Sequence, residues 1–118
     1  MSCLDLLVGI RGDSLRHIIE DQLTRSSTSA CCNLRAVHYS QSRAAFIAKS
    51  SIVIEELDES CFWLELMGDR QLVKNEQIAP VLKEGKELVA ILAASRITAM
   101  KNQKREKSLK ASRPPKPI

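Results

Sequence analysis

Apolar residues recur every three or four positions along most of the chain, with polar residues between them. This spacing is typical of amphipathic α-helices. Gly12 suits the end of a preceding helix, and Asp13 or Ser14 suits an N-cap. The first long pattern therefore predicts a helix that begins at Asp13 or Ser14 and stops before the break at residues 39–42. Its inner face consists of Leu15, Ile18, Ile19, Gln22, Ser26, Ser29, Ala30, Asn33 and Val37.

Two more patterns of the same kind follow. One predicts a helix from about Arg43 to Met67, with Ser40 or Ser42 as its N-cap and Gly68-Asp69 after its end. The other begins near Asn75 or Ala79, places Pro80 near the first turn and fades near Met100. The two inner faces consist of Phe46, Ser50, Val53, Leu57, Ser60, Leu64 and Met67, and of Ile78, Val81, Leu82, Gly85, Leu88, Val89, Leu92, Ser95 and Ala99.

A short apolar run within Met1–Ile10 precedes these patterns and predicts a fourth, short helix. The chain has 118 residues, 44% of them hydrophobic, so one compact domain is expected. Only 3% of residues are aromatic, and the 4 Gly and 4 Pro are too few for the turns of a β-sandwich or barrel. We therefore expect an all-α, up-down four-helix bundle over residues 1–107, followed by a basic, Pro-containing flexible tail over residues 108–118.

Two of the predicted helices are apolar over more than one face. A single small bundle can bury such wide faces by itself, but the simpler interpretation is a second buried surface between subunits. We therefore predict a homo-oligomer. Its expected interface consists of Ile52, Phe62, Trp63, Leu66, Ile91 and Ile97.

Polar residues also fall on the inner faces. Small Ser side chains allow close helix approach, and a buried Asn33 needs a partner such as Glu55, Glu56 or Glu59. We favour a structural polar cluster, consisting of Arg25, Ser29, Asn33, Glu55 and Glu59. The alternative is a small-molecule-binding or enzymatic bundle that uses this cluster between the second and third helices.

Other chemistry is sparse. Di-iron bundles need Glu-x-x-His on two helices, and the sequence contains none; His17 and His38 suit solvated or capping positions. Cys31 and Cys32 diverge on a helix and cannot easily chelate together, while Cys3 and Cys61 complete no disulfide pattern. We expect no catalytic residue, cofactor or metal, and a reduced cytoplasmic protein with small buried thiols.

The net charge of +4 is unevenly distributed. From residue 101 onward the chain has seven bases and one acid, whereas the first hundred residues have 11 bases and 13 acids. This indicates basicity in the tail rather than in the body. RNA or DNA is the expected target, bound through phosphates in a salt-dependent and sequence-tolerant way, because no aromatic residue is interleaved with the bases. A merely solubilising tail is the alternative. The predicted contacts are Lys101, Lys104, Arg105, Lys107, Lys110, Arg113 and Lys116.

Two segments resemble a known family of four-helix-bundle proteins, some of which are encoded within intervening sequences of bacterial large-subunit ribosomal RNA genes. The resemblance rests on the patterns RSxTS, SRAxFIAK and EExDExxxWLEL and on an Asn four residues after the second Ser of the first pattern. The segments are QLTRSSTSACCNLRAVHYSQSRAAFIAKSSIVIEELDESCFWLEL (Gln22–Leu66) and VLKEGKELVAILAASRITAMKN (Val81–Asn102).

This resemblance implies a bacterial, cytoplasmic bundle without enzymatic activity, assembled as a homo-oligomeric ring, with pentamers known in the family. It also implies a more distant similarity to the accessory variability determinant of diversity-generating retroelements, which partners a reverse transcriptase and RNA. The family's first helix is usually about twice as long as the Met1–Ile10 run, and small residues usually stand where this chain has Cys31-Cys32.

Overall fold

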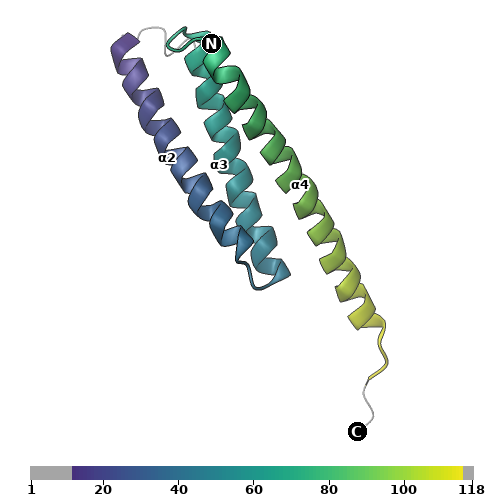
Figure 1. Ribbon diagram of the computed structural model, residues 1–118. Helices are drawn as coiled ribbons and strands as arrows, with labels where there is room; N and C mark the ends of the chain where they lie inside the picture. Colours follow the sequence, from purple (N-terminus) through teal and green to yellow (C-terminus); the bar gives the residue numbers. More distant parts are fainter. Residues whose placement is uncertain (1–11, 116–118) are drawn as a thin grey trace, which may run out of the picture.

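The computed structural model describes residues 12–115, which form three antiparallel helices and no strand. They are α2 (Gly12–His38), α3 (Arg43–Asp69) and α4 (Asn75–Ser112). Helix α3 lies between the other two and packs against both (Figure 1). The molecule is elongated, with extents of 74 × 29 × 19 Å, because α4 has 38 residues and continues beyond its neighbours. All-α architecture is thus confirmed.

The predicted four-helix bundle is wrong: the described residues contain three helices. The fourth was expected from Met1–Ile10, which lies outside the described residues. A helix of ten residues would span only about 15 Å, whereas the 27 residues of α3 span about 40 Å, so the predicted short helix could have covered only part of the bundle.

Local interactions define both ends of α3. Ser42 caps α3 from an extended conformation, and its Oγ accepts a hydrogen bond from the Ala45 amide at 3.1 Å. At the other end the Arg70 amide donates to the Leu66 carbonyl at 3.0 Å, and Gln71 adopts a left-handed φ of 57°. Because α4 begins at Asn75, Pro80 lies inside the helix, beyond its first turn. Since Pro has no amide proton, it removes one backbone hydrogen bond there.

The core is divided into two apolar clusters. One contains buried residues near the start of α2, the end of α3 and the start of α4: Leu15, Ile19, Leu66, Met67 and Ile78. The other lies toward the α2–α3 connection and contains Val37, Val53 and Leu92. Between these clusters the helices meet through small side chains, and Ser26 Oγ lies 2.8 Å from Ser60 Oγ in a buried hydrogen bond.

Candidate nucleic-acid interface

The C-terminal part of α4 carries most of the predicted phosphate contacts. An ion pair between Arg43 and Glu106 (2.6 Å) shows that the first residue of α3 lies beside Glu106, so the end of α4 extends beyond α3. The helix ends at Ser112, five residues after the predicted boundary at residue 107, and Arg113 follows it. Lys116 lies outside the described residues. The exposed bases of this extension are Lys101, Lys104, Arg105, Lys107, Lys110 and Arg113.

The fold adds four bases that the sequence analysis did not assign to this surface. Arg35 is near the end of α2, and Arg43 and Lys49 lie in the first two turns of α3. Arg96 joins α4 to α3, because its Nε donates to the Ile47 carbonyl at 3.1 Å. We call these four residues and the six bases of the α4 extension the basic end.

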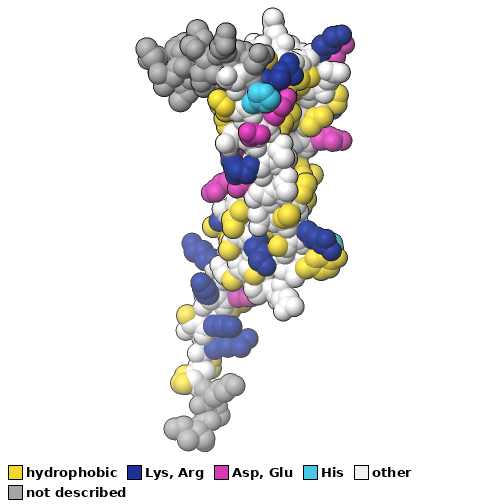
Figure 2. Space-filling model, turned by 90° about the vertical axis from the view of Figure 1, so that its left-hand side faces the viewer, with side chains coloured by type: hydrophobic (Ala, Val, Ile, Leu, Met, Phe, Trp, Pro, Cys, Tyr) yellow, Lys and Arg dark blue, Asp and Glu magenta, His cyan; other side chains and the backbone are white. Residues whose placement is uncertain are grey.

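The interpretation that basicity lies only in the tail is therefore wrong. Residues 26–54 contain three bases and no acid, and residues 88–113 contain seven bases and one acid. Antiparallel packing places these two stretches at the same end of the molecule (Figure 1). Residues 12–24 and 55–87, by contrast, contain five bases and twelve acids. Figure 2 shows Lys and Arg side chains gathered in the lower half and Asp and Glu mainly in the upper half.

The single acid of the basic end is neutralised within it. Arg43 donates a hydrogen bond to Glu106 and thereby lowers the pKa of that carboxyl below its ordinary value. Glu106 therefore remains ionised at neutral pH and offsets Arg43. Lys110 also lowers the Glu106 pKa, but a single carboxylate offsets only one positive charge, so a positive field remains at this end.

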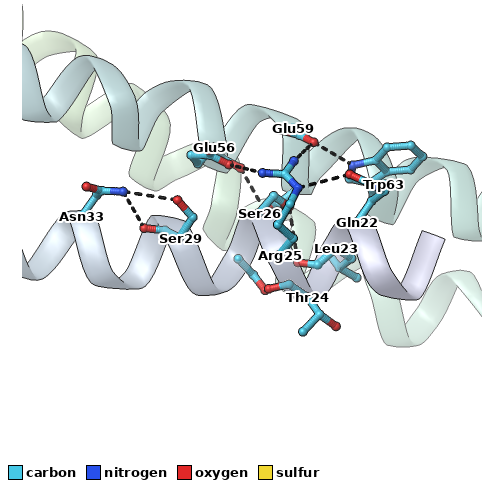
Figure 3. Close-up of polar contacts among 12 residues, drawn as sticks. Gln22, Leu23, Thr24, Arg25, Ser26, Ser29, Asn33, Glu56, Glu59 and Trp63 are labelled. Atoms are coloured by element: carbon cyan, nitrogen blue, oxygen red, sulfur yellow. Dashed lines mark hydrogen bonds and ion pairs between the residues drawn. The ribbon is translucent and has the colours of Figure 1, made fainter. Parts of the chain in front are cut away.

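The predicted polar cluster divides into two parts (Figure 3). Arg25 on α2 pairs with Glu59 and, at 3.5 Å, with Glu56 on α3. The Trp63 indole also donates to Glu59, at 3.3 Å. The hydrogen bond from Arg25 is the largest cause of a lowered Glu59 pKa.

The second part of the cluster stays within one helix. Asn33 Nδ2 donates to the Ser29 carbonyl at 3.0 Å and to Ser29 Oγ at 3.3 Å. The expectation that Asn33 bonds a carboxylate of the next helix is therefore wrong, because the preceding turn supplies acceptors. Glu55 is exposed, and the hydrogen bonds of Arg25 reach Glu56 and Glu59 instead.

The residues predicted to form an oligomer interface have different environments. Leu66 is buried in the core of the chain and cannot contribute to an outer surface. Trp63 is half-buried, and its ring meets Phe62 edge-on with centroids 5.0 Å apart. Ile52, Phe62, Ile91 and Ile97 are exposed, with Phe62 at 46% and Ile91 at 62%.

An apolar groove of about 490 Å³ lies where all three helices contribute side chains. It is lined by side chains of α2 (Leu23, Ser27, Ala30, Cys31 and Leu34), of α3 (Leu57, Ser60, Cys61 and Leu64) and of α4 (Val81, Glu84, Gly85 and Leu88). The groove and the exposed apolar side chains together leave substantial apolar surface uncovered in one copy of the chain.

The cysteines and histidines are the remaining candidates for reactive or metal-binding side chains. Cys31 and Cys32 are exposed, so among the described cysteines the expectation of a buried thiol holds only for Cys61, whose pKa is raised by burial; Cys3 lies outside the described residues. Within residues 12–115 no three His, Cys, Asp or Glu side chains gather as metal ligands would. None of the described helices combines the length and hydrophobicity needed to span a bilayer.

Comparison with known proteins places the chain among its relatives. A crystal structure from Bacteroides thetaiotaomicron, of a protein of unknown function in the S23 ribosomal protein family, is similar with a TM-score of 0.63 and 32% identity. The match covers 67% of this chain and 73% of that one. No curated protein matches the chain. Residues 13–94 match the family described as 23S rRNA-intervening sequence protein. The chain therefore belongs to the 23S rRNA-intervening sequence protein family.

Proposed function

We propose that the chain is a non-enzymatic, cytoplasmic adaptor that binds RNA or DNA backbones through its basic end and associates with further copies of itself. One observation carries the nucleic-acid part. Ten bases and one acid lie at one end of the molecule, although the whole chain has a net charge of only +4. Such segregation is costly through like-charge repulsion, and a polyanion relieves it.

The proposed contacts are electrostatic. Neutralising a phosphate releases condensed counterions, so log affinity falls with log salt by about 0.7 per contact on single strands and about 0.9 on duplexes. Four of the exposed bases on the α4 extension therefore contribute a slope of about 3. Affinity should depend little on sequence, because phosphates are the same in every sequence.

The test compares two variants with the same net charge. In the first, Lys101, Lys104, Arg105 and Lys107 become Gln; in the matched control, Arg16, Lys74, Lys83 and Lys86 become Gln. Binding to labelled RNA and DNA is followed by fluorescence anisotropy between 50 and 400 mM KCl. We expect the first variant to lose affinity and about 3 of the salt slope, and the control to keep both. Equal losses in both variants contradict a localised interface.

The proposal of self-association is supported by the apolar groove and by the exposed side chains of Ile52 and Phe62. Sedimentation equilibrium measures the mass against 13.2 kDa for one chain. The double variant Ile52→Gln/Phe62→Gln should dissociate, whereas Leu109→Gln, which removes a somewhat more exposed apolar side chain elsewhere, should not. A wild-type monomer at micromolar concentration contradicts this part and leaves the nucleic-acid part standing.

A further inference from the structure

The α2–α3 connection brings aromatic side chains to the basic end. Tyr39, the single tyrosine of the chain, is 68% exposed, and its ring meets the His38 ring edge-on at 5.0 Å. Beside them is an open hollow of about 990 Å³, with the half-buried Phe46 in its wall. Its other lining residues include Leu34, Val37 and Arg35, so an apolar floor meets a positive rim.

The backbone around Tyr39 is held in place. The Tyr39 amide donates to the Arg35 carbonyl at 3.2 Å, and the Ser40 amide donates to the Val37 carbonyl at 3.1 Å. Ser40 Oγ adds a bond to the Ala36 carbonyl at 3.2 Å. These bonds continue the last turn of α2, so the ring projects from a rigid support. Because this backbone is already ordered, stacking of Tyr39 on a ligand need not pay the cost of ordering a loop.

The charge of the residues around the hollow indicates which class of ligand it binds. No acid occurs between Asp21 and Glu55, so the stretch around the hollow is purely basic. An exposed aromatic within a positive field is the combination that single-stranded nucleic acids require, since every base has a π-face and every phosphate a charge. A duplex can use only the charge, because its bases are stacked on one another.

We propose that the hollow receives an unpaired base of single-stranded RNA or DNA, which stacks on Tyr39 while neighbouring phosphates contact Arg35 and the α4 bases. This rests on the proposed function and narrows it from polyanions in general to single strands. In the linear sequence no aromatic residue is interleaved with the bases of the tail, since Tyr39 and Lys101 are 62 positions apart. The proposed site depends on the fold, which brings Tyr39 to the basic end.

The first experiment compares Tyr39→Ala, Tyr39→Phe and the wild-type chain on a 12-nucleotide oligo-U RNA, an oligo-dT DNA and an RNA duplex of equal phosphate number. Losing one stacked base typically weakens binding by about 5- to 150-fold. We expect that loss for Tyr39→Ala on the single strands, a change of less than about twofold on the duplex, and an unchanged salt slope. Tyr39→Phe should retain single-strand affinity, as should Ile18→Ala, a control at an exposed apolar position in the acidic half.

The second experiment locates the contact. Trypsin cleavage after Arg35 and Arg43 releases a peptide of residues 36–43. Irradiation of 4-thiouridine-containing RNA bound to the full chain should crosslink to this peptide, as detected by mass spectrometry. Stronger binding of oligo-U or of oligo-dT identifies which polymer fits the hollow better.

The outcomes separate the two proposals. If Tyr39→Ala binds single strands as tightly as wild type while removal of the α4 charges still weakens binding, the stacking site is refuted and the phosphate interface stands. Crosslinks confined to α4 peptides refute the stacking site in the same way. If no probe binds at 50 mM salt, both proposals fail.

Discussion

The contact between Gly85 of α4 and Cys61 of α3 allows a test of the fold, because removing the Cys61 sulfur should reverse the sign of the effect of Gly85→Ala on stability. Gly85 lies in the interior of α4, where Ala normally stabilises a helix by about 1 kcal/mol relative to Gly. A Cβ added at Gly85 would lie 2.9 Å from the Cys61 sulfur, much closer than the roughly 3.5–4.0 Å of an unstrained contact. Cys61 is buried, so its sulfur cannot move aside freely. Because overpacking costs about 1–3 kcal/mol, we expect Gly85→Ala to destabilise the protein by about 0–2 kcal/mol.

Removing the sulfur should reverse that result. Cys61→Ala alone should cost about 1 kcal/mol, as expected for a small buried group. In this background Gly85→Ala meets no obstacle and should stabilise the protein by about 1 kcal/mol. The coupling energy of the double-mutant cycle is therefore about 1–3 kcal/mol.

Urea unfolding at a fixed protein concentration measures all four members of the cycle, and constant m-values show that the unfolded state is comparable. Ser95→Ala at an exposed position of α4 reports the propensity gain without any contact. If Gly85→Ala stabilises the wild-type chain as much as it stabilises the Cys61→Ala chain, the two helices do not meet as closely as described.

Three shorter predictions concern other parts of the fold. Ser60→Ala removes the buried hydrogen bond to Ser26 and should lower the free energy of unfolding by about 1 kcal/mol in urea melts; an unchanged midpoint contradicts the bond. Gln71→Gly should raise stability by about 0.5–1 kcal/mol, because Gln71 has a left-handed φ after the end of α3; a lower melting temperature argues against that conformation. Arg25 lowers the Glu59 pKa in the folded state, so the ion pair between them stabilises the fold at pH values above the unfolded Glu59 pKa of about 4.3. This stabilisation is lost as the pH falls through the folded Glu59 pKa. Glu59→Gln should therefore show a shallower loss of melting temperature between pH 6 and pH 3, and an unchanged acid limb would exclude this pair as its source.

The individual helices could be predicted from the sequence because their signals are local. The bounds of α3 differ from the prediction by only two residues, since Ser42 is a strong N-cap and Gly68-Asp69 interrupts the apolar stripe. Their number could not be predicted in the same way. Whether an apolar run such as Met1–Ile10 adds a helix depends on packing partners rather than on the run itself.

Contacts between helices were harder to predict than the helices. Arg25 and Glu59 were placed in one cluster and do meet, because long side chains can adjust to an imprecise register. Asn33 has a short side chain and bonds its own helix instead. Leu66 and Phe62 illustrate the same limit: periodicity marks both as lying off the main stripe, yet one is buried and the other exposed.

The basic end also shows what a linear count of charges misses. The acid-free stretch of residues 22–54 is centred on residue 38, which is the last residue of α2. A hairpin that turns there brings both halves of the stretch to one end of the molecule. Helix α4 runs antiparallel to α3, so its basic C-terminal part returns to the same end. The concentration of charge thus follows from the position of the turn, which the sequence does indicate.

Such a concentration should destabilise the α4 extension while it supports binding. Lys104 has Lys101 and Lys107 three residues away on either side, and each like-charge pair costs about 0.2–0.5 kcal/mol. Lys104→Glu converts both pairs into attractive ones, a gain of about 1 kcal/mol, and should slow amide hydrogen exchange in residues 100–110 about fivefold at low salt. The same substitution should weaken RNA binding. On the same helix Lys83→Glu applies the same charge change but removes an ion pair with Glu87, so it should speed local exchange and leave RNA affinity unchanged. We expect helix stability to rise and RNA affinity to fall in Lys104→Glu, because charge is retained there for binding at a cost in stability. If stability and affinity fall together, the lysines support the helix rather than a ligand.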